Sequence, residues 1–165
     1  MNVAKMELRP FIPEDQERIL QILTDRTVNK TYMLPDFERK EDAIPLFNRL
    51  MELSANSSRY VRCICIESQP VGYLNDAEIK NNSIELGYVI HPDSQNRGYM
   101  TMALEQAIAE LLGTGYEEVI CGAFKENQAS IRVMEKCGMI KMEHTDLIEY
   151  RGINHRCVYY SKRNG

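Results

Sequence analysis

HPDSQNRGYM, at residues 91–100, joins a predicted β-strand to a predicted helix and places a glycine where the helix begins. The strand is SIELGYVI, at residues 83–90. The first N–H groups of a helix have no intrahelical partner, and the helix dipole favours an anion at that end. Gly98 allows close approach to the backbone, and Gln95 and Arg97 can add donors. The stretch is therefore either an ordinary strand–helix connection or a loop whose amides face an anionic ligand.

The composition is that of one globular domain, spanning residues 1–165. The chain has 20 basic and 24 acidic residues and a net charge of −4, which disfavours nucleic-acid binding through bulk electrostatics. MNVAKMELRPF contains no long apolar stretch, so we expect no signal peptide or membrane span and predict a cytoplasmic location. The five cysteines, without Cys-x-x-Cys spacing, predict buried reduced thiols.

Hydrophobic periodicity predicts a mixed sheet covered by helices, in the order β, α, α, β, β, β, α, β, α, β, β. Residues 29–42 are polar, aromatic and interrupted by Pro35, so they predict a loop or an irregular helical link. The other predicted elements are the strand MELRPF, a helix from Pro13, a helix over 43–53, the strands YVRCICIE, VGYLNDAEI and SIELGYVI, a helix over 98–112, the strand EEVICGAF, a helix over 127–137, and two tail strands around Arg151-Gly152.

Two signatures resemble those of the GNAT acetyltransferase superfamily. Residues 90–100 resemble its acetyl-CoA pyrophosphate loop, Gln/Arg-x-x-Gly-x-Gly/Ala after a strand that ends near a proline. Residues 127–130 and 135–139 resemble its second signature, an Asn-x-x-Ser helix that ends in Lys-x-Gly-Phe. Tyr150-Arg151-Gly152 before a closing strand is similar to the branch that contains ribosomal-protein N-terminal acetyltransferases.

The resemblance implies a fold and an activity. The fold is a mixed α/β (α+β) arrangement: a mostly antiparallel sheet of six to seven strands, flanked by about four helices and splayed at the acetyl-CoA-binding strand. The activity is acetyl-CoA-dependent N-acetyl transfer, with acetyl-CoA as cosubstrate and no metal. The expected partners are acetyl-CoA and an amine acceptor, without nucleic acid or membrane, in a monomer or a homodimer.

The resemblance also implies which residues hold the cofactor. The loop residues are expected to bind the pyrophosphate, and a backbone N–H near Val89 or Ile90 of the splayed strand is expected to meet the thioester oxygen. Asn127 caps its helix, contacts the pantetheine arm, or does both, and Ser130 either reaches the cofactor or bonds back into the helix. The predicted loop residues are Gln95, Asn96, Arg97, Gly98, Tyr99, Met100 and Thr101.

Two residues depart from the family pattern. Met100 stands where the family has Gly or Ala, so we expect its side chain to turn into the core. Met134 stands where many members have a tyrosine that protonates the departing thiolate. A thioether cannot donate that proton. The acid role is therefore unassigned, or it is filled by water or by another tyrosine.

Glu85 is the candidate base, because the acceptor amine must lose a proton and family members often use an acid on this strand. Strand periodicity places Glu85, Gly87 and Val89 on one face. Gly87 leaves room beside Glu85 for a substrate or cofactor. The alternative is that Glu85 is a solvated strand residue with a basic partner. The same periodicity places Ile84, Leu86, Tyr88 and Ile90 on the other face.

The three histidines have structural interpretations that compete with catalytic ones. His91 lies just past the strand end, where it either caps the turn or is the next candidate base. His144 and His155, on the tail strands, are predicted to be surface or half-buried residues. Their spacing does not indicate a metal site.

Several functions remain open. The acceptor is a protein N-terminal amine, favoured by the branch resemblance, or a small-molecule amine or antibiotic. The main rival is a non-catalytic acyl-CoA-binding module, which Met134 favours, whereas Glu85 and the Asn127/Ser130 signature favour an enzyme. A nucleotide-phosphate binder is disfavoured because the chain has no Gly-Lys-Ser/Thr loop.

Overall fold

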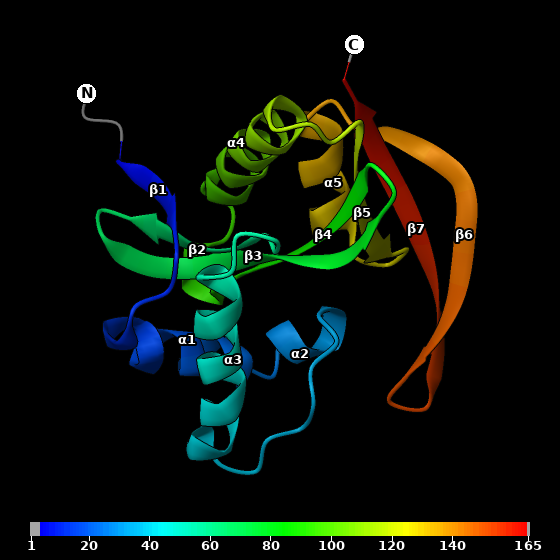
Figure 1. The fold of residues 1–165 in the computed structure, drawn as a ribbon. Coiled ribbons are helices and arrows are strands. Elements are labelled where there is room, and N and C mark those ends of the chain that lie inside the picture. Colours follow the sequence, from blue (N-terminus) through cyan, green and yellow to red (C-terminus); the bar gives the residue numbers. More distant parts are fainter. Residues whose placement is uncertain (1–3, 165) are drawn as a thin grey trace. The chain divides into compact units, whose positions relative to one another are not determined.

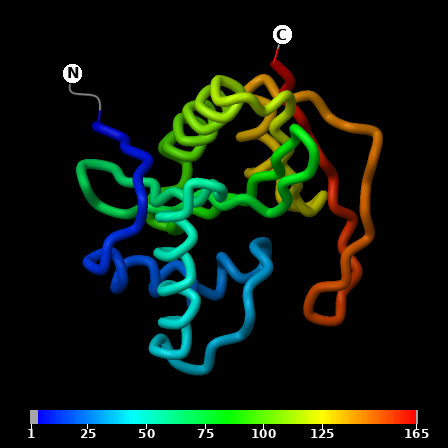
Figure 2. The backbone as a smooth tube through the Cα atoms, viewed as in Figure 1, coloured from blue at the N-terminus to red at the C-terminus, as the bar shows by residue number. Residues whose placement is uncertain are grey.

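The computed structural model describes residues 4–164, which form a mixed α/β fold with a seven-stranded sheet in the order β1-β2-β3-β4-β5-β7-β6 (Figure 1). The chain divides into two compact units. The first contains the chain up to Asn75 together with Tyr88–Tyr99, and the second contains Asp76–Gly87 together with the chain from Met100 onward. Strands β3 (Gln69–Lys80) and β4 (Ser83–Ile90) run from one unit into the other. The chain path can be followed in Figure 2.

The first unit combines antiparallel strands with three helices. β2 pairs antiparallel with both β1 and β3. Buried apolar side chains from these helices and strands, among them Ile19, Phe47 and Tyr73, form one core. The elements of this unit, besides the parts of β3 and β4 given above, are β1 (Met6–Arg9), α1 (Gln16–Leu23), α2 (Val28–Thr31), α3 (Ile44–Ser54) and β2 (Val61–Ile66), with 3₁₀ turns at Pro13–Asp15, Lys40–Ala43 and Pro92–Ser94.

The start of α1 is fixed by a buried carboxylate. Asp15 accepts two hydrogen bonds from the Arg9 guanidinium, at 2.8 and 2.9 Å, and one from the Ile12 N–H at 2.9 Å. Pro13 is pre-organised for the first helical position, since its ring fixes φ and it lacks an N–H. The helix therefore begins where the proline and acids predict it.

The second unit contains the first part of β4 and the C-terminal elements. β4 pairs parallel with β5, and β7 pairs antiparallel with both β5 and β6. β6 and β7 form the long hairpin seen in Figure 1. Its turn has positive φ at Arg151 (54°) and Gly152 (77°), the combination that a two-residue hairpin turn requires. The remaining elements are α4 (Tyr99–Gly113), β5 (Glu118–Phe124), α5 (Gln128–Lys136), β6 (Ile140–Tyr150) and β7 (Ile153–Arg163).

The two faces of β5 in the second unit differ. Val119, Cys121 and Ala123 are buried, whereas Ile120 and Gly122 between them are only half-buried. The apolar face of α4, which includes Met100, is buried as predicted. The face of Ile120 and Gly122 is therefore the more accessible face of β5.

The predicted element order is confirmed, with one addition. The segment predicted as a loop or irregular link contains the short helix α2 and the 3₁₀ turn Lys40–Ala43, which raises the helix count above the expected four. All five cysteines are free and buried, as predicted. Among the described residues, no helix combines the length and apolarity that crossing a membrane requires.

Candidate active site

The loop before α4 has the backbone geometry of an anion-binding turn. Asn96 (φ 62°) and Gly98 (φ 78°) both adopt the left-handed conformation, on either side of Arg97. Alternation of backbone hand turns successive N–H groups toward one point, which is the arrangement of anion-binding nests. No atom lies within 4 Å of the position that a Gly98 Cβ would take. The space beside Gly98 is open, which is compatible with close approach of a ligand to the backbone there.

Two residues of this loop, Arg97 and Tyr99, line a surface cavity of about 680 Å³ in the first unit. Arg18 of α1 and the acidic residues Glu14, Glu17 and Asp93 line it too. Arg18 also donates from Nε to the Pro70 carbonyl at 3.1 Å. Gln95 and Asn96 are exposed and Tyr99 is half-buried. The predicted loop residues thus offer backbone amides at the turn, and Arg97 adds positive charge beside it.

The end of β4 makes close contact with β3. A Cβ on Gly72 would lie 2.1 Å from the Val89 carbonyl oxygen, so this approach requires glycine. The His91 N–H donates to the Val71 carbonyl at 2.6 Å. In a strand, successive residues direct their N–H groups to opposite sides. Because His91 faces β3, the Ile90 N–H faces away from it, and Ile90 is the better of the two predicted oxyanion donors.

His91 is a turn cap. Its Nδ1 atom accepts a hydrogen bond from the Asp93 N–H at 3.1 Å, and the residue is buried. Burial lowers the pKa of its imidazole, and the positive charge of Arg18 lowers it further. The capping interpretation of His91 is confirmed.

β4 separates from β5 partway along its length. Their register runs from Ser83–Glu118 to Leu86–Cys121, although β4 continues to Ile90 and β5 to Phe124. The predicted splay of this strand is therefore present. Burial along β4 changes beyond this point: Ile84 and Leu86 are buried, the next buried residue is Val89, and Tyr88 and Ile90 are half-buried. Val89 belongs to the core of the first unit.

Glu85 lies on the half-buried face of the second unit, opposite Ile120 of β5. Burial raises the pKa of its carboxyl group, and the negative charges of Glu78 and Asp146 raise it further. A carboxylate with a raised pKa is a stronger base than an ordinary surface carboxylate. This environment differs from that of a solvated residue paired with a cation.

The second signature, Asn127 to Ser130, forms the start of α5. The Asn127 Oδ1 atom accepts a hydrogen bond from the Ser130 N–H at 3.2 Å, so the predicted helix cap is confirmed. The cap uses the oxygen, and a contact with the pantetheine arm would use the Nδ2 group. Ser130 is half-buried.

Met134 of α5, by contrast, has no exposed surface and belongs to the core. Thr101, in the first turn of α4, accepts a contact from the Cys137 thiol with its carbonyl (3.6 Å).

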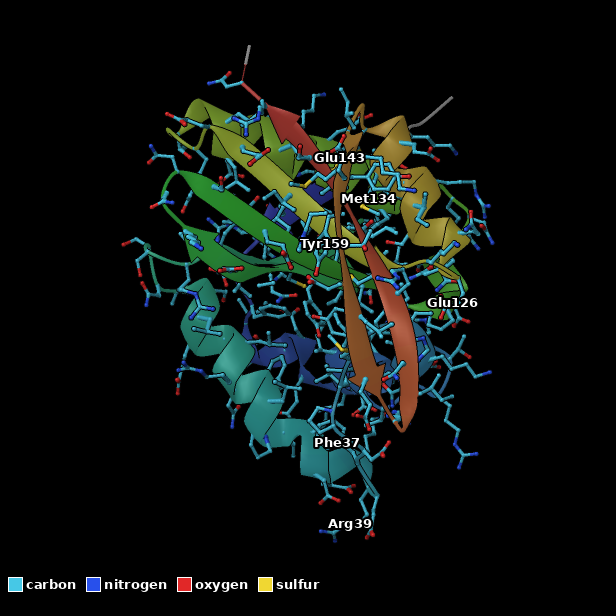
Figure 3. All side chains as sticks on the ribbon, turned by 90° about the vertical axis from the view of Figure 1, so that its right-hand side faces the viewer. Phe37, Arg39, Glu126, Met134, Glu143 and Tyr159 are labelled. Atoms are coloured by element: carbon cyan, nitrogen blue, oxygen red, sulfur yellow. The ribbon has the colours of Figure 1, made fainter. Side chains whose placement is uncertain are left out.

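A hydrogen-bonded group on β6 and β7 was missed by sequence reasoning. The Tyr159 hydroxyl donates to Asp146 Oδ2 at 2.7 Å, and His144 Nε2 lies 3.1 Å from the same oxygen. Figure 3 labels Tyr159, which lies on β7. A Cβ on Gly122 would lie 2.8 Å from the Tyr159 ring. The available signal was the His-x-Asp spacing, which puts His144 and Asp146 on one face of a strand.

The other tail histidine has a different setting. His155 Nδ1 lies 2.6 Å from Glu126 Oε1, and its ring stacks on Phe124 with centroids 4.3 Å apart. The prediction that both tail histidines are surface or half-buried residues is confirmed: His144 is exposed and His155 is half-buried. Within residues 4–164, no group of three or more His, Cys, Asp or Glu side chains is arranged to hold a metal ion.

Residues 5–140 match the family described as the acetyltransferase (GNAT) domain. The chain belongs to the GNAT acetyltransferase family. It is therefore an acetyl-CoA-dependent N-acetyltransferase, and the predicted family and fold class are confirmed. The match includes the loop, Glu85 and the Asn127 signature, and it ends at the start of β6. The β6–β7 hairpin, where Tyr159 and Asp146 lie, falls outside it.

This GNAT protein is similar to a curated N-acetyltransferase and to solved acetyltransferase structures. The Uncharacterized N-acetyltransferase YnaD of Bacillus subtilis (strain 168) is 27% identical in an alignment of 145 residues, and the match covers 84% of this chain and 81% of that protein. The microcin C7 self immunity acetyltransferase MccE, solved with acetyl-CoA and AMP, has a TM-score of 0.85 at 19% identity, over 97% of this chain and 93% of that one. RimL, a ribosomal L7/L12 alpha-N-protein acetyltransferase solved with coenzyme A, also has a TM-score of 0.85, at 18% identity, over 96% and 93%. The two solved structures share the fold of this chain.

Proposed function

We propose that this GNAT protein transfers the acetyl group of acetyl-CoA to a protein N-terminal amine. Two observations support this acceptor. The Tyr150-Arg151-Gly152 turn before the closing strand is similar to that of ribosomal-protein N-terminal acetyltransferases. RimL, which is such an enzyme by its name, shares the fold over nearly the whole chain.

The backbone N–H groups of residues 95–101 hold the pyrophosphate of acetyl-CoA in this proposal. The left-handed Asn96 and Gly98 and the open space at Gly98 support this placement. Arg97 supplies positive charge, and Asn127 and Ser130 bind the pantetheine arm. The cosubstrate supplies an activated acyl group, and the protein supplies its position.

The charge that develops on the thioester oxygen is met by a backbone donor at the end of β4. The N–H of Ile90, next to Val89, faces away from β3 and is the donor proposed. A preorganised N–H directed at the developing oxyanion stabilises the transition state more than the ground state.

Glu85 takes the proton that the acceptor must lose. An alkyl ammonium group is almost fully protonated at neutral pH and cannot attack a carbonyl carbon until it is neutral. The single observation that carries the catalytic proposal is the half-buried Glu85 carboxylate, whose pKa is raised by burial and by Glu78 and Asp146.

A small-molecule amine is the second candidate acceptor. MccE, named for immunity to microcin C7, matches the fold with the same TM-score as RimL. In this proposal the acceptor is selected by the irregular segment 29–42 and by the β6–β7 hairpin, because binding residues are often found in connecting segments. The structure of the cofactor loop is compatible with either acceptor.

A thiol-release assay with acetyl-CoA tests the proposal. The panel contains peptides with free N-termini, the same peptides with blocked N-termini and a free lysine, polyamines, and aminoacyl compounds. We expect turnover with free N-termini and little with the blocked peptides. Turnover confined to small amines would contradict the acceptor. Tight coenzyme A binding without turnover on any amine would indicate a non-catalytic acyl-CoA-binding module.

A further inference from the structure

Three side chains of the β6–β7 hairpin form a continuous hydrogen-bonded chain. The Tyr159 hydroxyl donates to Asp146 Oδ2 at 2.7 Å, and His144 Nε2 lies 3.1 Å from that oxygen. The rings of His144 and Tyr159 stack, with centroids 5.4 Å apart and planes at 24°. The chain runs outward: Tyr159 is half-buried, the Asp146 side chain is 46% exposed and that of His144 is 64% exposed.

The inner end of this chain lies on the same sheet face as Glu85. Glu85 pairs with Ile120, and Ile120 pairs with Ser161 of β7. Directly paired residues share a face, and so do residues two apart along a strand. Tyr159 is two residues from Ser161, so it lies on the face of Glu85. Its ring crosses β5 at Gly122, where any side chain would collide with it.

Glu85 and the Tyr159–Asp146–His144 chain also interact electrostatically. The negative charge of Asp146 is one of the causes that raise the pKa of Glu85. Hydrogen bonds from Tyr159 of β7 and from His144 of its own strand lower the pKa of Asp146, and the charge of Asp146 in turn raises the pKa of Cys157 of β7. Burial and the bond to Asp146 raise the pKa of Tyr159, so its hydroxyl keeps its proton and acts as a relay rather than as an anion.

The proposed reaction requires an exit for a proton. An ammonium nitrogen loses two protons when it becomes an amide nitrogen: a C–N bond forms, the C–S bond breaks, one proton is taken up by the sulfur and one is released to solvent. A base that has taken a proton must return it to water before the next turnover. The half-buried position of Glu85 makes a relay to the surface useful.

We propose that the chain Tyr159–Asp146–His144 carries this proton from the Glu85 face to solvent. The inference rests on the proposed function. The protonated Glu85 carboxyl gives its proton, through water, to Tyr159 Oη as the Tyr159 proton passes to Asp146 Oδ2. Asp146 then passes a proton to His144 Nε2 when that nitrogen carries no hydrogen. The exposed imidazolium then releases the proton to water. Tyr159, Asp146 and His144 are therefore proton-relay residues, distinct from the base itself.

Kinetics of two variants test the relay. Tyr159→Phe keeps the ring and removes the inner link, and it should lower kcat on the order of 10²-fold while KM for the acceptor changes little. His144→Gln removes the outer link and should cause a smaller loss of kcat in dilute buffer. Added imidazole should restore His144→Gln, because a mobile base replaces the outermost group, but should not restore Tyr159→Phe. A purely structural role would not produce this buffer dependence.

Two matched controls accompany these variants. His155→Gln alters the other histidine–carboxylate contact of the second unit, and Glu143→Gln neutralises an exposed acid on the strand of His144. Both should retain wild-type kcat at every imidazole concentration. Wild-type kcat in Tyr159→Phe, or failure of imidazole to restore His144→Gln, would overturn the relay. A wild type that acetylates no amine would instead overturn the proposed function.

Discussion

The cofactor loop and the Glu85 face are built in different ways. The loop consists of consecutive residues whose backbone makes the proposed site, with Asn96 and Gly98 in the left-handed conformation. The Glu85 face consists of side chains from strands far apart in the sequence: Glu85 on β4, Asp146 on β6 and Tyr159 on β7. A site made by consecutive backbone groups leaves a local sequence pattern, whereas a site made across strands depends on register.

The loop and the Glu85 face are expected to have different roles, cofactor binding and catalysis, which experiments can distinguish. Changes in the loop should act on coenzyme A affinity and leave the chemistry of the bound complex alone. Changes on the Glu85 face should act on turnover and leave affinity alone. A variant of either region that altered both quantities equally would show that the division is wrong.

The largest expected effect is that of Glu85→Gln. The change keeps the size of the side chain and removes the charge that accepts a proton, so kcat/KM at neutral pH should fall by about 10²-fold or more. Steady-state kinetics with saturating acetyl-CoA provide the measurement. Glu149→Gln, an exposed acid on β6, is the control and should be unchanged. Near-normal kcat/KM in Glu85→Gln would show that Glu85 is not the base and is only a solvated strand residue.

Gly98→Val should act on the other region. A β-branched residue is strained at φ 78°, so the loop amides should lose their orientation and the dissociation constant for coenzyme A should rise well over tenfold, ~1.4 kcal/mol. Calorimetry measures the change. Gly98→Asn is the matched control, because asparagine tolerates the left-handed region, and it should bind more tightly than Gly98→Val. Equal affinity in Gly98→Val and wild type would contradict the placement of the pyrophosphate.

Asn127→Ser should separate the cap of α5 from a contact with the cofactor. Serine caps a helix about as well as asparagine but lacks the Nδ2 donor, so the melting temperature should be preserved. Loss of one hydrogen bond should weaken coenzyme A binding by about 0.5–1.5 kcal/mol. Thermal unfolding and calorimetry measure the two effects. Unchanged affinity would leave Asn127 with its capping role alone.

Met134→Tyr should have the smallest effect on catalysis. Met134 has no exposed surface, so the larger ring must displace core side chains, at a cost of about 1–3 kcal/mol in stability. We expect kcat to stay at the wild-type level because the new hydroxyl lies within the core. Met134→Leu is the volume-matched control for the melting temperature. A rise in kcat would show that position 134 faces the thiol sulfur and that thiolate protonation limits turnover.

Much of the fold follows from local patterns in the sequence. Pro13 with its acids, the glycine of residues 91–100, the Asn127 cap and the Arg151-Gly152 turn each fix the end of an element within a few residues. The change in burial along β4 could not be predicted in this way. It coincides with the end of pairing with β5 at Leu86–Cys121, which depends on a strand more than thirty residues away in the chain.

In the candidate site, too, the local features could be predicted and the contacts between strands could not. The loop residues and the Asn127 cap were predicted, because their geometry is set by neighbours in the sequence. The contacts of Tyr159 were not, because the ring meets Gly122 on β5 and Asp146 on β6 only through the register of three strands. Position 122 requires glycine because the Tyr159 ring lies against it, and this contact is known only from the structure.

The pH dependence of kcat/KM tests the central claim most directly. A base acts only when deprotonated, so wild-type kcat/KM should rise with pH through a pKa above the ordinary glutamate value, since burial, Glu78 and Asp146 all raise the pKa of Glu85. Glu85→Gln should lack this rise and approach the wild-type rate at high pH, where the amine arrives neutral, while both proteins bind coenzyme A equally. A constant ratio of the two rates across the pH range would contradict the account.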